Sequence, residues 1–325
     1  MIHVPISDGN RAQAVRQAVA ALRAGKLVAV PTETVYGLAA DAANGEAVAR
    51  IFEAKGRPRF NPLICHVTDI AMAARYGVFD ERALRLAEKF WPGPLTIVLP
   101  LAQNAPAHPL VTAGLPSVAL RAPVGPARDI IAGLDGAVAA PSANRSGRLS
   151  PTRAEHVLAQ FAGEHGQNIA LVLDAGPCAV GLESTIVALT GERPTLLRPG
   201  GVPAEAIETV LGTRLGRAGA GDAVTAPGML TNHYAPNLPV RLDVDSVRPG
   251  EGLLAFGDVP VAGAEHAAAV RNLSPKGDLV EAAANLFAYM AELDASGATG
   301  IAVAPIPQAG LGEAINDRLK RAAAR

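Results

Sequence analysis

Short apolar runs alternate with segments of helical periodicity along residues 1–212 of the chain. Strands are expected at residues 27–30, 62–67, 95–99, 117–123, 137–140, 169–173, 185–189 and 195–198. Helices are expected at residues 11–24, 46–54, 81–90, 127–132, 154–162 and 203–211. Because strands and helices alternate irregularly, the pattern predicts an α/β (α+β) fold with a twisted mixed sheet and flanking helices.

The hydrophobic pattern fades between residues 213 and 239, where Gly, Ala and Pro are frequent. A connection of this length is unusual inside a compact domain, so we expect a linker with a function of its own. Beyond it, residues 240–325 predict a small Rossmann-like α/β domain. Its strands are expected at residues 240–244, 253–256, near 268–273 and at 301–304, and its helices at residues 279–294 and 313–323.

Three cations, Lys55, Arg57 and Arg59, fall within five residues. Gly and Pro residues separate them and disfavour a helix across the run. The run leads into the apolar residues 62–67, so the cations are expected at the mouth of the sheet. An anionic ligand suits this place, because Arg binds phosphate or carboxylate in bidentate fashion. A solvated basic turn is the alternative for so short a motif.

A fourth cation lies within an expected strand, at residues 117–123. Side chains alternate along a strand, so Ser117, Ala119 and Arg121 share one face. A charge in so apolar a strand usually has a partner or a ligand. Spacing alone leaves an internal salt bridge and a bound anion equally open for Arg121.

Polar residues gather at the ends of the expected strands, where α/β folds place ligands. The loop at residues 141–152 combines hydroxyls, an amide and two Arg, and predicts a phosphate cradle without a Walker motif. Its alternative is a polar loop in which Ser150 or Thr152 caps the next helix, as Ser7 or Asp8 is expected to cap the first. The collected strand ends offer mainly cations and hydroxyls: Thr34, Lys55, Arg57, Asn61, His66, Ser117, Arg121, Ser142, Asn144, Ser150, Ser184 and Arg198.

This set of side chains suits phosphates together with another anion. Carboxylates are too scarce for hydrolysis by a carboxylate pair. The sequence contains no H-E-x-x-H motif, cysteine cluster or G-x-S-x-G elbow. We therefore expect no metal held by the protein alone, and any Mg²⁺ is expected on the phosphates of a nucleotide.

Composition narrows the class further. The chain has 325 residues, of which 49% are hydrophobic and 18% charged, which is typical of folded domains with large cores. Aromatic residues make up 4% and the net charge is −1. Both values argue against stable nucleic-acid binding, which needs stacking surfaces or a positive surplus.

The two cysteines, Cys65 and Cys178, lie far apart in apolar settings. They are expected to be buried thiols, not a disulfide, which is consistent with a reducing, cytoplasmic environment. No signal peptide is expected from the first residues, and no apolar run reaches the length of a membrane span.

Four motifs, in order, resemble the YrdC family. They are Pro-Thr-Glu-Thr-Val-Tyr-Gly at residues 31–37, Lys-Gly-Arg-Pro at 55–58, Ser-Ala-Asn at 142–144 and Gly-Leu-Glu-Ser-Thr at 181–185. The linker, with His233-Tyr234-Ala-Pro, and the ending at residues 310–323 resemble the longer, two-domain members. The resemblance covers the whole chain and implies a YrdC-like catalytic domain at 1–212, a linker or lid over the active site at 213–239 and a C-terminal domain at 240–325.

The resemblance implies a nucleotidyltransferase that makes threonylcarbamoyl-AMP. Such enzymes join L-threonine, bicarbonate or CO₂ and ATP, with Mg²⁺, and release pyrophosphate. A separate threonylcarbamoyl transferase complex then modifies certain tRNAs. The residues implied for L-threonine are Thr34, His66, Arg121, Ala140 and Ser184. The residues implied for ATP are Lys55, Arg57, Asn61, Ser117, Ser142, Asn144, Ser150, Arg198 and, from the linker, Tyr234.

Two alternatives remain beside this hypothesis. A binding protein for structured RNA would use the same basic concave surface on an RNA backbone. The near-neutral charge and the many hydroxyls favour a small ligand over RNA. A related module that forms an adenylate from carbamoyl phosphate is the second alternative. Those modules usually belong to much larger chains with zinc-binding segments, which this sequence lacks.

Overall fold

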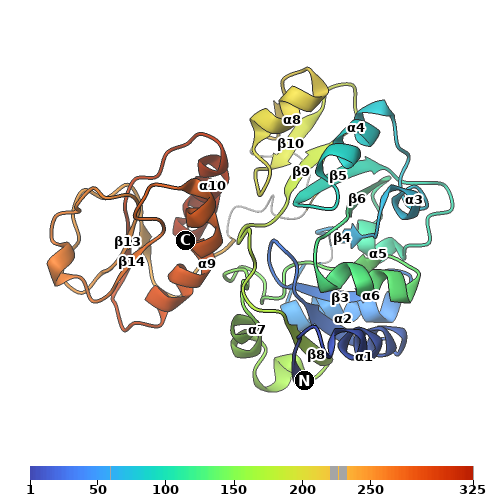
Figure 1. Ribbon diagram of the computed structural model, residues 1–325, viewed down its shortest axis with the longest axis horizontal. Coiled ribbons are helices and arrows are strands. Elements are labelled where there is room, and N and C mark those ends of the chain that lie inside the picture. The colour runs from blue at the N-terminus through green and yellow to red at the C-terminus, as the bar shows by residue number, and fades with distance from the viewer. Residues whose placement is uncertain (59, 220–225, 227–232, 325) are drawn as a thin grey trace.

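The protein forms two β-sheets, each covered by helices, in a computed structural model (Figure 1). The structure describes residues 1–58, 60–219, 226 and 233–324. Arg59 and most of the predicted linker motif before His233 therefore lie outside the described residues. The two sheets account for the mixed α/β fold that the hydrophobic pattern predicts.

The first sheet has eleven strands in the order β1-β8-β2-β3-β7-β4-β6-β5-β9-β10-β11. They are β1 (Ile2–Pro5), β2 (Leu27–Val30), β3 (Gly37–Asp41), β4 (Ile64–His66), β5 (Leu95–Pro100), β6 (Ser117–Arg121), β7 (Val138–Ala139), β8 (Ile169–Asp174), β9 (Thr185–Ala188), β10 (Thr195–Arg198) and β11 (Gly216–Arg217). Parallel pairs such as β4·β6 and β5·β9 stand beside antiparallel ones such as β2·β3 and β5·β6. The sheet is therefore mixed, as expected.

Helices pack on both faces of this sheet (Figure 1). They are α1 (Arg11–Arg23), α2 (Gly45–Lys55), α3 (Ile70–Ala73), α4 (Glu81–Phe90), α5 (Pro109–Thr112), α6 (Pro126–Leu134), α7 (Ala154–Gln160) and α8 (Ala204–Leu211). Gly56 follows α2 with φ 61°, a left-handed conformation that ends the helix at little cost for glycine. The cation Lys55 is thus the last residue of a helix, and the chain leaves the helix directly after it.

The second sheet has four parallel strands in the order β12-β15-β13-β14. Its elements are β12 (Val240–Arg241), β13 (Gly252–Ala255), β14 (Val270–Asn272), α9 (Leu279–Asp294), β15 (Ile301–Val303) and α10 (Leu311–Ala323). In Figure 1, α9 and α10 lie on the side of this unit that meets the rest of the molecule. All four strands and both helices match the hydrophobic pattern, although β12 is much shorter than expected.

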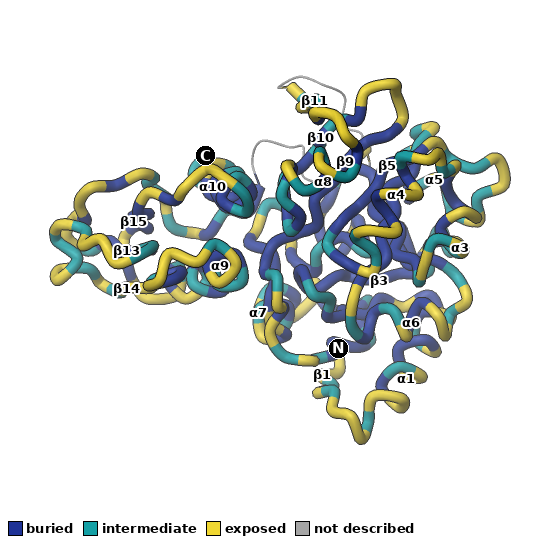
Figure 2. Tube along the Cα trace, turned by 45° about the horizontal axis from the view of Figure 1, so that its top comes forward, coloured by how far each residue is buried: buried dark blue, intermediate teal, exposed yellow. Residues whose placement is uncertain are grey.

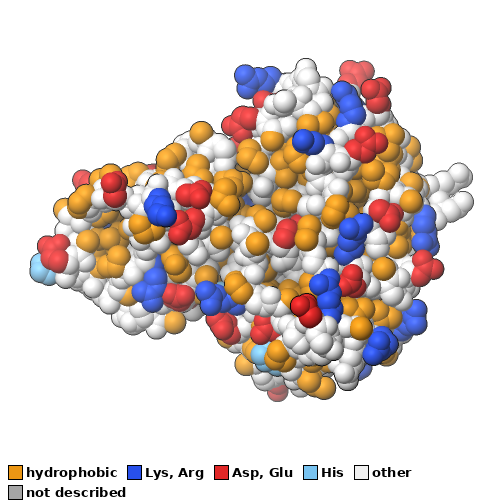
Figure 3. All heavy atoms as spheres, viewed as in Figure 1, with side chains coloured by type: hydrophobic (Ala, Val, Ile, Leu, Met, Phe, Trp, Pro, Cys, Tyr) orange, Lys and Arg blue, Asp and Glu red, His pale blue; other side chains and the backbone are white. Residues whose placement is uncertain are grey.

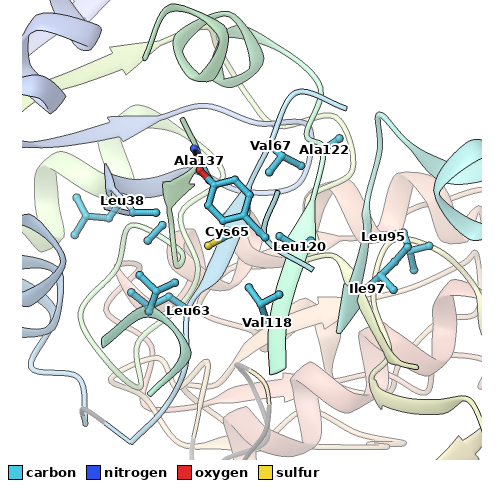
Figure 4. Close-up of a cluster of buried hydrophobic side chains, with 14 of the residues drawn as sticks. Leu38, Leu63, Cys65, Val67, Leu95, Ile97, Val118, Leu120, Ala122 and Ala137 are labelled. Atoms are coloured by element: carbon cyan, nitrogen blue, oxygen red, sulfur yellow. Dashed lines mark hydrogen bonds between the residues drawn. The ribbon is translucent and has the colours of Figure 1, made fainter. Parts of the chain in front are cut away.

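The core beneath the first sheet shows why certain side chains reach its other face. Figure 4 shows Leu63, Cys65 and Val67 of the β4 segment packed near Val118 and Leu120 of β6. Because side chains alternate along a strand, the residues between them must point to the opposite face. A large aromatic side chain supports the same core, since the Tyr76 hydroxyl accepts a hydrogen bond from the Ala137 N–H at 2.8 Å. Cys65 and Cys178 are both free and buried, as predicted.

A separate hydrophobic cluster joins the two units. It combines α9 and α10 residues such as Phe287, Ile315 and Leu319 with Leu149 and Leu182 of the first unit. Figure 2 shows buried chain on both sides of this contact. The C-terminal unit is therefore packed against the first one through a shared apolar core.

Some local predictions were wrong. Asn10 precedes α1, and its side chain bonds the Ser7 N–H and the Pro5 carbonyl, so neither Ser7 nor Asp8 caps this helix. Arg153 precedes α7 without a side-chain cap, so neither Ser150 nor Thr152 caps this helix. The Ser150 hydroxyl binds a buried carboxylate instead, and the Thr152 hydroxyl has no hydrogen-bond partner among the described residues. The pattern also missed β1, β3, α3, α5 and β11, which are five residues or fewer and too short to show a clear period.

In the described part of the chain, no helix combines the length and the apolar character that crossing a membrane requires.

Candidate active site

A pocket lies where several strands of the first sheet end, facing the chain that leads to the second sheet. Its lining residues are Thr34, Val35, Arg57, Ile64, His66, Arg121, Ala140, Pro141, Ser142, Glu183, Ser184, Arg198, His233 and Tyr234. They come from at least six separate segments, so the pocket exists only in the folded chain.

Strand geometry brings the central residues together. Strands β4 and β6 are parallel, and His66 is directly opposite Arg121 at their ends. Ile64 and His66 alternate with the core residue Cys65, so they face the pocket while the thiol faces the core. The same alternation directs Arg121 to the pocket face of β6. The sheet therefore directs the Arg121 guanidinium and the His66 imidazole towards the same pocket.

Arg121 has an internal partner as well as a place in the pocket. Its Nη2 donates to Glu33 Oε1 at 2.6 Å, and its Nε donates to the Gly93 carbonyl at 3.2 Å. The side chains of Arg121 and Glu33 are 5% and 10% exposed, so this is a buried ion pair. The salt bridge that spacing left open is therefore present, and the guanidinium lines the pocket in addition.

Three further cations stand in or directly behind the pocket lining, and their described hydrogen bonds go to carbonyl groups or hydroxyls. Lys55 donates to the carbonyls of Ser142 and Asn144. Arg57 donates to the Pro62 carbonyl at 3.0 Å, and Arg198 donates to the Ser184 carbonyl at 2.9 Å. Such bonds orient the cations, and a cluster of three oriented cations suits the binding of an anion.

The pKa values of two of these cations are lowered, because the site around them is poorly solvated. Burial, together with the neighbouring Arg57, lowers the pKa of Lys55 well below its ordinary value. Burial and the nearby Arg198 lower the pKa of Arg57 to about 10. Both pKa values are lowered mainly by the cost of burying a charge away from water, and a neighbouring cation adds to each shift. A bound anion would offset both effects.

One carboxylate, Glu183, lines the same pocket. Its Oε1 accepts a hydrogen bond from the Ser150 hydroxyl, and its Oε2 accepts from Arg318 Nε at 2.8 Å. Burial alone would raise the pKa of Glu183, but Arg318 and Arg198 and the Ser150 hydrogen bond lower it to about 2. Glu183 is therefore ionised, and it balances part of the positive charge of the pocket.

Two buried histidines in the pocket are neutral. Burial and the nearby Arg121 lower the pKa of His66 to about 3. Burial likewise lowers the pKa of His233 to about 3, although Glu183 opposes the shift. The Nδ1 atoms of both rings are buried without a hydrogen-bond partner among the described residues. Unpaired polar atoms in a pocket are free to bind a ligand.

Tyr234 closes the pocket from the linker side. Its ring lies 4.1 Å from the His233 ring and 5.6 Å from the Phe287 ring, centroid to centroid. The Arg318 guanidinium lies over the same ring at 5.0 Å, a cation–π contact. The Tyr234 hydroxyl is buried without a hydrogen-bond partner in the described chain. The C-terminal helix α10 thus holds this aromatic side chain against the pocket.

The structure brings together nine of the residues singled out from the sequence. Those that line the pocket are Thr34, Arg57, His66, Arg121, Ala140, Ser142, Ser184, Arg198 and Tyr234. Lys55, Asn61 and Asn144 stand directly behind the lining: Lys55 and Arg57 bond the backbone carbonyls of Asn144 and Asn61. The side-chain Oδ1 atoms of both Asn residues are buried and unpaired within the described structure.

Two predicted residues lie elsewhere. Ser150 lines a neighbouring hollow between α7 and α9 and reaches the pocket only through Glu183. Ser117 is at the start of β6, four residues before Arg121, so it is about 13 Å from the pocket end of the strand. It shares the face of Arg121, as predicted, but it is not among the lining residues.

The sequence did not single out five lining residues: Val35, Ile64, Pro141, Glu183 and His233. Glu183 and His233 stood inside recognised motifs, and that position was the available signal. The other three are apolar residues within two positions of a predicted site residue, and nothing in their type marks them. They shape the pocket without supplying polar groups.

The residues of the pocket do not form a metal site by themselves. Within the described residues, no group of three or more His, Cys, Asp or Glu side chains is arranged to hold a metal ion. Both oxygens of Glu183 are already bonded, to Ser150 and Arg318. Cations and hydroxyls dominate the lining, and such a set of donors binds anions.

Comparison with known proteins gives the family of this chain. Residues 20–200 match the Sua5/YciO/YrdC family, whose description reads telomere recombination. Residues 202–324 match the threonylcarbamoyl-AMP synthase C-terminal domain. The chain belongs to the Sua5/YciO/YrdC family, in the form that carries this additional C-terminal domain.

Relatives of nearly the same length have one name in common. The threonylcarbamoyl-AMP synthase of Bacillus subtilis is 39% identical over 95% of this chain and 92% of its own length. That of Pyrococcus abyssi is 43% identical over 95% of this chain and 93% of its own length. The protein is accordingly an enzyme that makes an adenylate.

A solved structure supports the same assignment. The crystal structure of P. abyssi Sua5 complexed with L-threonine has a TM-score of 0.87 and 37% sequence identity, and the match covers 99% of this chain and 97% of that chain. Escherichia coli YciO matches 61% of this chain with a TM-score of 0.53 at 18% identity, which supports the fold alone. The two-unit architecture is therefore that of Sua5.

Proposed function

We propose that this enzyme joins L-threonine, bicarbonate or CO₂ and ATP into threonylcarbamoyl-AMP and releases pyrophosphate. The near-full-length relatives named threonylcarbamoyl-AMP synthase support the product. The relative that was crystallised with L-threonine supports the amino acid. The pocket supports both, because it combines buried cations with neutral hydrogen-bonding groups in one space.

The amino acid is proposed to occupy the part of the pocket next to β4 and β6. Thr34, His66, Arg121, Ala140 and Ser184 would surround L-threonine, and all five line the pocket. Arg121 is suited to the carboxylate, because a guanidinium binds carboxylates in bidentate fashion. His66 is neutral at physiological pH, so it would not repel the substrate's ammonium group.

ATP is proposed to bind along the wall formed by Arg57 and Arg198. The full set assigned to the nucleotide is Lys55, Arg57, Asn61, Ser117, Ser142, Asn144, Ser150, Arg198 and Tyr234. Lys55 uses two of its three N–H donors on carbonyls, which leaves one for a phosphate oxygen. The distance of Ser117 from the pocket makes it the weakest member of this set.

The chemistry needs little acid–base machinery. The ammonium group of L-threonine first loses a proton to solvent, and the resulting amine forms a bond to the carbon of CO₂ and releases a second proton to give a carbamate. A carbamate oxygen then forms a bond to the α-phosphorus of ATP, while the bond from that phosphorus to the bridging oxygen breaks and pyrophosphate leaves. The protein positions the reactants and neutralises the charge of their carboxylate, carbamate and phosphate groups, and positioned cations supply the main catalytic effect.

The domain roles follow the same proposal. Residues 1–212 would form the catalytic domain, residues 213–239 the lid, and residues 240–325 a domain that anchors the lid. The contact of Arg318 with Tyr234 is the support for this anchoring role. A threonylcarbamoyl transferase complex would use the product for tRNA modification.

Mg²⁺ and the cellular setting complete the proposal. The pocket offers no metal site made by the described residues alone, so Mg²⁺ would arrive on the phosphates of ATP. The buried free thiols are compatible with the cytoplasm.

RNA binding by the same surface is the weaker alternative. On the face shown in Figure 3, Lys and Arg side chains alternate with Asp and Glu side chains, whereas an RNA-binding face usually carries a continuous basic stripe. Thermal stabilisation by RNA, and none by ATP with threonine, would favour this alternative.

The observation that carries the proposal is the convergence of Arg57, Arg121 and Arg198 on one buried pocket. The direct test is mass spectrometry of a reaction that contains the full chain, ATP, bicarbonate and L-threonine, with L-serine as the control. Threonylcarbamoyl-AMP and pyrophosphate are expected with threonine, and much less product with serine. Absence of the adenylate with threonine would overturn the proposal.

A further inference from the structure

Glu33 is a mostly buried carboxylate that does not line the pocket and has no place in the proposed reaction. Its Oε1 accepts from Arg121 Nη2 at 2.6 Å, and its Oε2 accepts from the Val124 N–H at 3.0 Å. Its main-chain carbonyl accepts from the Val180 N–H at 2.7 Å. Glu33 is thus held on three sides, and its two carboxylate oxygens connect the loop after β2 with the loop after β6.

These bonds determine which N–H groups of Arg121 remain for a ligand and in which direction they point. The Nε hydrogen goes to the Gly93 carbonyl and one Nη2 hydrogen goes to Glu33, which leaves three of the five N–H donors. Within the described structure, those three have no hydrogen-bond acceptor. A guanidinium is planar, so two fixed bonds on one edge also fix the direction of the remaining donors. These three donors form the free edge of the guanidinium, and Arg121 is one of the residues that line the pocket.

We propose that Glu33 is a positioning residue, which fixes the Arg121 guanidinium so that its free edge receives the carboxylate of the amino-acid substrate. This inference rests on the proposed function, in which that substrate is L-threonine. Without Glu33, Arg121 would keep its charge but lose its orientation, and a long side chain with several rotamers would have to be ordered by the substrate itself. Glu33 therefore acts on recognition of the substrate's carboxylate and not on phosphate binding.

A purely structural role for Glu33 predicts something different. A buried ion pair that only supports the fold would, when broken, weaken every ligand or lower the stability without selectivity. A positioning role predicts a selective loss, confined to the group that Arg121 contacts. The carboxylate can be isolated by comparing L-threonine with L-threoninol, in which a hydroxymethyl group replaces the carboxylate.

The experiment is calorimetric titration of the full chain with L-threonine and with L-threoninol. Wild-type protein is expected to prefer threonine, and Glu33→Ala is expected to reduce the ratio of the two Kd values on the order of tenfold. In steady-state assays the same variant should raise KM for threonine by a similar factor. Its KM for ATP and its kcat at saturating threonine should stay within about twofold of wild type.

Two further variants keep the test decisive. Glu33→Asp retains the charge, and hence the fold, but its shorter side chain cannot hold Arg121 and Val124 together, so the ratio should fall by about threefold. Glu251→Ala is the matched control, because it breaks the Arg241–Glu251 ion pair in the C-terminal unit, where Glu251 is similarly buried. The threonine-to-threoninol ratio of this control should equal that of wild type.

The outcomes separate the two hypotheses. An unchanged ratio in both Glu33 variants, with threonine still bound, would overturn the role of Glu33 and leave the proposed substrate intact. An equal loss for threonine and threoninol would reduce Glu33 to a structural residue. No binding of threonine by the wild-type chain would overturn the proposed substrate, and the role of Glu33 with it.

Discussion

Two buried Glu–Arg pairs stand beside the pocket, and they present opposite charges to it. In the pair Glu33–Arg121, the guanidinium lines the pocket and the carboxylate stands behind it. In the pair Glu183–Arg318, the carboxylate lines the pocket and the guanidinium stands behind it. The same interaction therefore presents a cation to the pocket at Arg121, here called the cationic wall, and a carboxylate at Glu183, here called the anionic wall.

The difference lies in where each counterion comes from. Glu33 and Arg121 both belong to the first unit, so this pair can form without the second sheet. Arg318 belongs to α10 of the C-terminal unit, and its side chain is fully buried against Glu183 and the Pro199 carbonyl. One wall is thus complete within the first unit, whereas the other needs the two units docked together. This comparison leads to four predictions, in order of decreasing effect.

Removing the Arg318 guanidinium is expected to have the largest effect. Arg318→Ala leaves Glu183 ionised and buried without the guanidinium that is hydrogen-bonded to it, with only the Ser150 hydroxyl bond and the nearby Arg198 remaining. The free energy of unfolding should therefore fall by about 3–5 kcal/mol. Urea denaturation measures this loss. Lys320→Ala, on an exposed position of the same helix, is the control and should change stability by less than about 0.5 kcal/mol. A loss as small as that of the control would mean that the anionic wall does not depend on the second unit.

Removing a pocket cation should affect turnover and spare the fold. Arg57 and Lys55 bond to carbonyls and not to a carboxylate. Neither Arg57→Ala nor Lys55→Ala therefore leaves a buried carboxylate without its hydrogen-bond partner. The loss of a positioned cation is expected to slow pyrophosphate release at least about a hundredfold. A coupled pyrophosphate assay measures the rate, and the exposed Lys26→Ala serves as the control. Full activity in either pocket variant would contradict the proposed nucleotide site.

The neutral histidines on the two walls predict a loss of stability in mild acid. His66 and His233 have pKa values of about 3 in the folded protein and near 6.5 when unfolded, so the unfolded state binds more protons below pH 6.5. Stability should be complete above that pH and fall towards pH 3, by up to about 1.4 kcal/mol per pH unit for each histidine.

Denaturation series between pH 7.5 and pH 5 measure this slope. His66→Gln and His233→Gln should each reduce it by less than half, because burial lowers the pKa of His156 as well, whereas the exposed His266→Gln should leave it unchanged. Glu183 contributes only at lower pH, because its stabilisation is present above about pH 4.5 and is lost as the pH falls towards 2. An equal slope in all three histidine variants would show that another group governs the acid response.

The smallest effect is expected from the hydroxyl that supports the anionic wall. Ser150→Ala removes one hydrogen bond to Glu183 but leaves the bond from Arg318. The free energy of unfolding should fall by about 1–2 kcal/mol, the usual range for a hydrogen bond to a charged group. Urea denaturation measures it, with the exposed Ser246→Ala as the control. A loss as large as that of Arg318→Ala would mean that the hydroxyl, and not the guanidinium, chiefly stabilises Glu183.

Much of the fold could be predicted from local patterns. The helix α4 and the strand β2 begin and end where periodicity and flanking turn residues place them. The family could be predicted too, because its motifs are runs of neighbouring residues. The residues that line the pocket were found mainly inside those runs. Ser117 shows the limit of this approach, since sharing a strand face with Arg121 did not bring it to the same end of the strand.

The partners of the charged residues could not be predicted in the same way. Spacing could not decide whether Arg121 has an internal counterion, because the Glu33–Arg121 bond joins residues 88 positions apart. Nor could it show that Ser150 binds Glu183 instead of capping a helix, because a hydroxyl serves either purpose equally well. Both choices depend on which loops the sheet brings next to each other.

The sequence by itself determined the elements, the mixed sheet followed by a second α/β unit, and the family, because periodicity, turn residues and motifs are local properties of the chain. Only the tertiary structure decided which member of each ion pair faces the pocket. A charge becomes useful to a ligand when its counterion stands behind it, and in this protein Arg121 and Glu183 have theirs on different elements, distant in the chain. The order of the strands and the docking of α10 supply that arrangement, and no local pattern records either of them.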